Sequence, residues 1–340
     1  MEVIKGLGIL LLVLMVFYLF STKCYKGNEA MTGLAGAAVA TFLVEAVFKY
    51  ILGDAVGISF AQSLGAAAGS SAGLICAILV MLKMDVESNV AVAVGASLVG
   101  MGILPGFISG YICAIIYDKI KDKLNDTLKL IAILLLFVPA GRLIAVITSP
   151  FVTFILNNIG TTIINATSMS PIFMGFVLGG LITVISTSPL SSMALTAMLG
   201  LTGIPMGIGC IACVGGAFAN GLMFTTIGIK DKSKIISLML EPLTQADLVT
   251  KNSGPLYSAS FIGGGLAGIM AVLFKISVDA PGTASSIPGF FTPFAFNPPV
   301  TVIKVLVLAI LAGSIGGYIS TYFYKGIVTL KNKRKFIKES

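Results

Sequence analysis

Long apolar segments separated by short polar ones run through almost the whole chain. Several reach about 18 residues, close to the length that a helix needs to cross the hydrocarbon core of a membrane. We expect such elements at residues 4–20, 31–52, 57–82, 89–117, 128–155, 171–185, 206–229, 256–278 and 300–323. The pattern predicts an all-α, polytopic membrane protein with about 9–10 transmembrane helices and two re-entrant hairpins.

One of these segments is expected to be bent or broken. Residues 89–117 are too long for one simple crossing and include Pro105 and several glycines. Proline removes a helical hydrogen bond and clashes with the preceding turn. We therefore expect a break near this proline.

Two polar, helix-breaking segments interrupt the apolar second half of the chain, at residues 186–196 and 240–252. A membrane has no water to satisfy freed backbone groups, so irregular backbone survives there only against protein or a wet cavity. Short, interrupted apolar segments of this kind are typical of transporter binding sites. The candidate substrate-binding residues are Ser188, Ser191, Ser192, Asn220, Glu241, Pro242, Thr244, Gln245, Asp247 and Arg142.

Among these candidates, the Glu241-Pro242 pair points most directly to ligand binding. Proline can leave an unpaired carbonyl beside the carboxylate, and such a group of acceptors suits a polyhydroxylated ligand such as a sugar. A helical turn would place Thr244 and Gln245 on the face of Glu241. The alternative is an interfacial turn that lipid headgroups solvate.

Other charges lie inside apolar segments and can be read in two ways. Arg142 in the segment 128–155 either faces a substrate pathway or belongs to a buried structural pair. Glu45 and Lys49 are one turn apart and can neutralise each other on one helical face, as a structural ion pair near the helix end.

Composition excludes several classes of protein. Hydrophobic residues make up 56% of the 340 residues and charged residues 11%, and the mean hydropathy is +1.02, so lipid is the main solvent. The net charge of +8 comes from lysines in short loops and at the C-terminus, which indicates membrane orientation and not nucleic-acid binding. The chain has no histidine, the commonest proton carrier and metal ligand. We expect no metal, no cofactor and no catalytic residue of its own. Cys210 and Cys213 form C-x-x-C without a soluble βαβ context, which favours packing.

The lysines also predict an orientation. Basic loops tend to stay on the cytoplasmic side, which places the segment 118–127, the loop 230–234 and the C-terminal tail inside. With four crossings before the first of these, the N-terminus is also inside. Lys23, Lys26 and Lys83 then lie outside, against the rule.

Several motifs resemble the enzyme IIC family, the membrane permeases of the sugar phosphotransferase system. Pro105-Gly-Phe-Ile-Ser-Gly-Tyr111 resembles the P-G-F-x-x-G-Y pattern of these permeases. The run from Pro189 to Gly203, the Glu241-Pro-Leu-Thr-Gln-Ala-Asp247 motif and the Ala280-Pro-Gly-Thr283 loop resemble the enzyme IIC-like branch that includes perfringolysin O regulator-type proteins. The resemblance spans roughly residues 30–325.

The resemblance implies a homodimer and a substrate glutamate before proline in the second hairpin, which Glu241 matches. It also implies four segments: a membrane interface or scaffold domain (1–117), an amphipathic linker (118–127), a transport domain (128–325) and a basic cytoplasmic tail (326–340). Relatives use a histidine in the first hairpin, which this chain lacks.

The expected function is transport of a sugar or polyol by elevator-like alternating access in a bacterial cell membrane. Separate IIA and IIB phosphocarrier subunits would have to supply phosphate, because the chain contains neither domain. Two alternatives stay open: a transporter-like regulator that affects toxin or metabolic gene expression, and an ion-coupled transporter without a phosphate relay.

Overall fold

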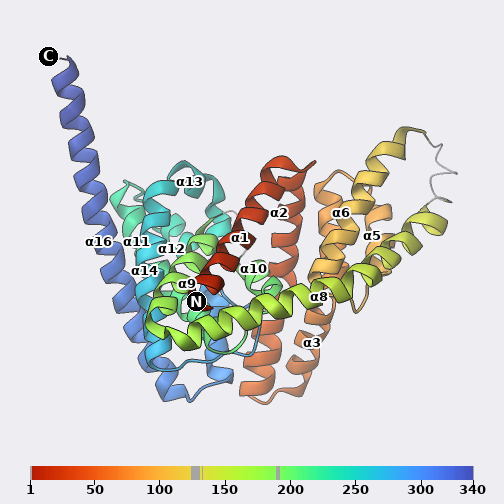
Figure 1. The fold of residues 1–340 in the computed structure, drawn as a ribbon, viewed down its shortest axis with the longest axis horizontal. Coiled ribbons are helices and arrows are strands. Elements are labelled where there is room, and N and C mark those ends of the chain that lie inside the picture. The colour runs from red at the N-terminus through yellow and green to blue at the C-terminus, as the bar shows by residue number, and fades with distance from the viewer. Residues whose placement is uncertain (1, 124–130, 132, 189–191, 340) are drawn as a thin grey trace. The chain divides into compact units, whose positions relative to one another are not determined.

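The computed structural model describes residues 2–123, 131, 133–188 and 192–339, and every regular element within them is helical (Figure 1). In chain order these elements are α1 (Glu2–Lys23), α2 (Gly27–Ala38), η1 (Val39–Leu43), η2 (Ala46–Ala55), α3 (Ser59–Ser70), α4 (Ala72–Lys83), α5 (Ser88–Ala96), α6 (Ile103–Ile120), η3 (Lys121–Lys123), η4 (Ile133–Phe137), α8 (Val138–Met169), α9 (Pro171–Thr187), α10 (Ser192–Met198), α11 (Gly203–Thr226), α12 (Lys232–Leu240), η5 (Pro242–Gln245), α13 (Ala246–Lys251), α14 (Ser253–Leu273), α15 (Ser286–Phe291), η6 (Thr292–Ala295) and α16 (Pro299–Glu339).

The predicted class, an all-helical polytopic membrane protein, is confirmed. Within the described ranges, 7 helices are long and apolar enough to cross a membrane, or 8 if the bent pair α3–α4 forms one span. The number is below the expected 9–10 partly because α9 has 17 residues and falls short of a full crossing. The bend of 49° between α3 and α4 marks a broken span or a re-entrant loop.

The chain divides into two compact units. Unit 1 contains residues 1–169 with the short segments 193–201 and 280–283, and unit 2 contains residues 170–192, 202–279 and 284–340. The linker expected at 118–127 lies mostly outside the described residues. The functional division at that linker remains a prediction, and the structural division falls at the end of α8.

In unit 1 the predicted break within residues 89–117 is confirmed. Helix α5 ends at Ala96, and α6 begins again at Ile103 with Pro105 in its first turn, where proline is tolerated. The α3–α4 bend lies against this break, because the backbone N–H of Gly73 donates to the carbonyl of Met101 at 3.1 Å.

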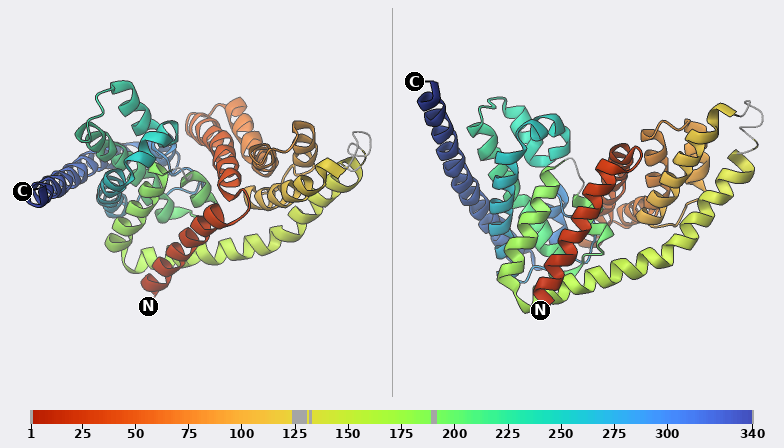
Figure 2. Two further views of the ribbon diagram at one scale, coloured as in Figure 1. Left: turned by 90° about the horizontal axis from the view of Figure 1, so that it is seen from above. Right: turned by 45° about the horizontal axis from the view of Figure 1, so that its top comes forward.

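Helix α8 is longer than expected, since the polar stretch from Asn157 to Met169 continues the helix. Figures 1 and 2 show the N-terminal end of α1 beside the C-terminal end of α8. A Cβ atom at Gly6 of α1 would lie only 2.5 Å from the Cβ of Ala166, so the small residue is required for this crossing. The ion pair expected on the second span is present, with Lys49 Nζ 2.8 Å from Glu45 Oε1.

The core of unit 2 is a bundle of α9, α11, α14 and α16. Glycines let these helices approach closely: a Cβ atom at Gly313 of α16 would lie 2.0 Å from the carbonyl oxygen of Gly215 on α11. Gly268 of α14 approaches the backbone of Gly175 on α9 in the same way. Small residues are the usual means of helix packing in lipid, where hydrophobicity alone does not drive helices together.

Candidate functional site

The first polar segment separates a helix of 17 residues, α9, from a helix of 7 residues, α10. Helix α9 ends at Thr187, and Ser188 follows in an extended conformation with its hydroxyl donating to the Ile185 carbonyl at 2.8 Å. Ser192 begins α10. Ser191 lies outside the described residues. Ser188 and Ser192, on either side of the undescribed residues, are both buried.

The second polar segment ends α12 at Glu241, as expected. The backbone of Glu241 is extended (φ −148°, ψ 95°), and its N–H still donates to the Ser237 carbonyl at 2.8 Å. The buried Pro242 then opens the short helix η5. Thr244 folds back, and its hydroxyl donates to the Glu241 carbonyl at 2.8 Å. The Thr244 hydroxyl therefore stabilises the turn itself.

The two breaks meet at one dipeptide in the loop before α15. The Ser192 hydroxyl donates to the Ala284 carbonyl at 2.5 Å. The next residue, Ser285, donates its hydroxyl to Glu241 Oε2 in a long hydrogen bond of 3.4 Å. Consecutive Cα atoms are about 3.8 Å apart, so the polar groups of the two breaks are close neighbours within unit 2.

Helix α11 carries Cys213 in the neighbourhood of Glu241. Cys213 of this helix lies beside Ser186 and Thr183 of α9 and within electrostatic range of the Glu241 carboxylate. Glu241 itself is half-buried. The Ser285 hydroxyl, from the loop before α15, donates to this carboxylate.

The Asn220 side chain is engaged in a buried hydrogen-bonded triad with Thr187 and Ser260. Its side-chain N–H donates to the Thr187 hydroxyl at 2.8 Å, its oxygen accepts from the Ser260 hydroxyl at 2.9 Å, and these two hydroxyls are 2.8 Å apart. All three residues are at most 2% exposed. The triad ties α9, α11 and α14 together, so Asn220 positions the end of α9.

Arg142 belongs to unit 1, where its guanidinium stabilises the α5–α6 break. Nη1 donates to the carbonyls of Ser97 at 2.9 Å and Val99 at 3.0 Å. These carbonyls follow the last turn of α5 and have no helical partner of their own. Ser109 of α6 reinforces the junction by donating to the Gly141 carbonyl at 2.8 Å.

The remaining candidates lie beyond the turn. Gln245 ends η5 and is half-buried, and Asp247 lies in the first turn of α13. A cavity of 310 Å³ adjoins this region and is lined mainly by apolar residues, including Met239, Leu240 and Phe290. Its lining does not suit a polyhydroxylated ligand.

Sequence reasoning missed Ser285 and Ser260. Ser285 follows the Ala280–Thr283 motif, and its place beside that motif was the signal that could have found it. Ser260 is a small polar residue three positions before the Gly263-Gly-Gly265 run, a spacing that places it on the same packed helix face.

The fold and these two breaks define a multi-pass helical membrane protein with a polar site inside one of its two units. The chain matches the protein family described as "Phosphotransferase system, EIIC" over residues 28–337 and therefore belongs to this family. The predicted membrane location is confirmed by that membership. No curated protein matches the chain at a significant level.

Proposed function

We propose that the protein is a permease that binds a sugar or polyol at Glu241 and moves it across a bacterial cell membrane. The movement is alternating access of the elevator type, in which a transport domain carries the bound ligand past a scaffold. The division of the chain into two compact units supports such a mechanism.

The observation that carries the proposal is the meeting of both polar breaks at Ala284 and Ser285. A ligand with many hydroxyls needs acceptors and donors on several sides. The Glu241 carboxylate offers strong, charge-assisted acceptors, and the serines around it offer both donors and acceptors. Asp247, Gln245 and Ser191 complete the proposed binding set on the strength of the sequence motifs.

Phosphate transfer needs other proteins. The chain has no histidine that could carry a phosphoryl group. We therefore assign to this protein the role of the membrane subunit of a phosphotransferase complex. Separate IIA and IIB subunits carry the phosphate in this proposal, and the permease itself works as a homodimer with its N-terminal domain (1–117) at the interface. Within the family, the motifs from Pro189 to Gly203 favour the branch of perfringolysin O regulator-type proteins.

The test is ligand binding and uptake by Glu241→Gln. The amide keeps the shape but loses the charge, and the loss of a charge-assisted hydrogen bond costs about 1.5–3 kcal/mol. We expect the affinity of the purified protein for the best ligand of a sugar and polyol screen to fall about tenfold or more. Glu29→Gln is the matched control, because Glu29 is exposed on α2 in the other unit.

Three results would change the proposal. Parental binding by Glu241→Gln would make Glu241 a solvated turn residue. Binding without uptake by the parent protein would indicate a sensor. Uptake that stops when the proton gradient is dissipated, with no phosphocarrier present, would indicate an ion-coupled transporter.

A further inference from the structure

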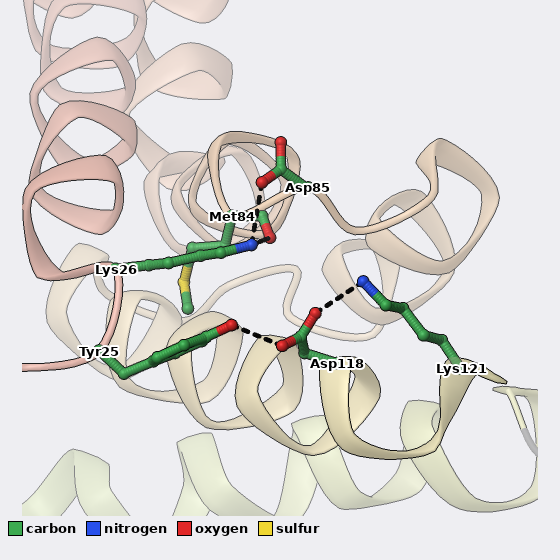
Figure 3. A network of polar contacts seen from close by, with 6 residues as sticks. All are labelled: Tyr25, Lys26, Met84, Asp85, Asp118 and Lys121. Atoms are coloured by element: carbon green, nitrogen blue, oxygen red, sulfur yellow. Dashed lines mark hydrogen bonds and ion pairs between the residues drawn. The ribbon is translucent and has the colours of Figure 1, made fainter. Parts of the chain in front are cut away.

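Three turns of unit 1 that are far apart in the sequence meet at one end of the unit (Figure 3). They are the turn between α1 and α2, the turn between α4 and α5, and the last turns of α6 together with η3. The residues drawn are Tyr25, Lys26, Met84, Asp85, Asp118 and Lys121.

Direct polar contacts join the three turns. Lys26 Nζ lies 2.9 Å from Asp85 Oδ2 and donates to the Met84 carbonyl at 2.8 Å. The Tyr25 hydroxyl donates to Asp118 Oδ2 at 2.5 Å, and the Tyr111 hydroxyl donates to the Tyr25 carbonyl at 2.9 Å. The hydrocarbon core of a bilayer is about 30 Å thick, so groups in such contact lie on one side of it.

This finding corrects the orientation expected from the sequence, which placed Lys23, Lys26 and Lys83 on the side opposite to the segment 118–127. The error came from counting residues 89–117 as one crossing. Helix α5 leaves the end that carries Asp85, and α6 returns to the same end at Asp118. The pair α5–α6 therefore enters and leaves on one side, and three crossings precede the linker.

Most of the described lysines of unit 1 are gathered at this same end, whereas Lys5 near the start of α1 and Lys49 in η2 lie toward the opposite end. Six lysines in its three turns lie within the described residues: Lys23, Lys26, Lys83, Lys119, Lys121 and Lys123. The opposite turn, between η2 and α3, has neither lysine nor arginine. Four of these lysines (23, 83, 119 and 123) are exposed, whereas Lys26 and Lys121 form ion pairs with Asp85 and Asp118.

We propose that this end is the cytoplasmic face of unit 1 and that its exposed lysines contact the anionic headgroups of the inner leaflet. The N-terminus then lies outside the cell. Glu29 and Glu87 are also exposed at this end, but orientation follows the basic residues and not the net charge. Lysines at the ends of spanning helices lie at headgroup depth, where anionic lipid attracts them.

The native Cys24 can report on which side of the membrane the α1–α2 turn lies. Cys24 lies in the α1–α2 turn and is exposed, whereas Cys76, Cys113, Cys210 and Cys213 are buried. A membrane-impermeant maleimide added to intact cells should leave Cys24 unlabelled and should label it after permeabilisation. In a Cys24→Ser background, Val56→Cys at the opposite end should be labelled in intact cells, because Val56 is 63% exposed.

A reporter on the third turn makes the test independent of Cys24 reactivity. Lys123→Cys in the Cys24→Ser background should be labelled only after permeabilisation, like Cys24. Labelling of either cysteine in intact cells would overturn the proposed orientation. Labelling of Cys24 and Lys123→Cys from opposite sides would overturn the shared face.

The headgroup contact needs its own measurement. The combined variant with Lys23, Lys83, Lys119 and Lys123 changed to glutamine should retain fewer anionic phospholipids per protomer on purification, measured by native mass spectrometry. The control changes Lys275 and Lys304, which are exposed in unit 2, and should retain the parental number. Equal retention by the quadruple variant and the parent would overturn the headgroup contact and leave the surface to a soluble partner.

Discussion

The two units each contain a helix break inside apolar sequence, and they stabilise it by different means. In unit 1 the guanidinium of Arg142, on α8, stabilises the α5–α6 break by donating to the carbonyls of Ser97 and Val99. In unit 2 the break after α12 carries a carboxylate, and the Ser285 hydroxyl donates to it in a long hydrogen bond of 3.4 Å.

The difference supports the proposal that the break in unit 2 binds the ligand, whereas the break in unit 1 is structural. Carbonyls that already accept strong hydrogen bonds from a fixed guanidinium have little left to offer a ligand. The long hydrogen bond from Ser285 to the Glu241 carboxylate is one that a ligand hydroxyl can replace with a shorter bond. Of the two interpretations of Arg142 made from the sequence, the structural one is favoured. The partners of Arg142 are backbone carbonyls and not a carboxylate.

The largest effect is expected from Arg142→Met. Each hydrogen bond to a charged donor contributes about 1.5–3 kcal/mol, and both carbonyls would lose this donor. We expect a large drop in the temperature at which the detergent-solubilised protein aggregates, or failure to insert. Arg142→Lys should restore part of the stability. Normal stability with lost ligand affinity would instead make Arg142 a substrate residue.

A smaller loss of stability is expected from Asn220→Ala. Removing the amide leaves Thr187 and Ser260 each short of one partner, which costs about 1–3 kcal/mol for a buried polar group. The same thermal assay measures it, with Asn165→Ala as a control because Asn165 is an exposed amide on α8. Reduced ligand affinity at unchanged stability would show that Asn220 contacts the ligand directly.

The positions of most elements could be predicted because apolar runs report the length of a helix in lipid. The break near Pro105 and the end of α12 at Glu241-Pro242 followed from proline geometry. The partners across helices could not be predicted, because Ser192 and Ala284 are 92 positions apart and no local pattern links them.

The orientation failed for a related reason. A helix pair that enters and leaves on one side can contain as many apolar residues as a helix that crosses the membrane. Hydropathy alone therefore could not show which of the two residues 89–117 form. Only the contact of Lys26 with Asp85 and of Tyr25 with Asp118 shows that the chain returns to the end from which it came.

A few-fold effect on ligand affinity is expected from Ser285→Ala. If the Ser285 hydroxyl orients the Glu241 carboxylate, losing it costs about 1 kcal/mol, which is roughly a fivefold weaker affinity. The effect should disappear in a Glu241→Gln background, as a double-mutant cycle measures. Ser286→Ala is the matched control, because Ser286 lines the apolar cavity. Additive effects of the two substitutions would separate Ser285 from Glu241.

The smallest effect is expected from Tyr25→Phe, at the exposed end of unit 1 where water competes for every polar group. The hydrogen bond to Asp118 raises the pKa of the Tyr25 hydroxyl above its ordinary value. Because the pKa is higher in the folded protein than in the unfolded chain, the contribution of Tyr25 to stability is fully present below about pH 10 and is lost as the pH rises through the folded pKa. Parent and variant should therefore differ slightly in thermal stability near neutral pH and become equal at strongly alkaline pH. A gap that widens in alkali would mean that ionised Tyr25, and not the neutral hydroxyl, makes the stabilising contact.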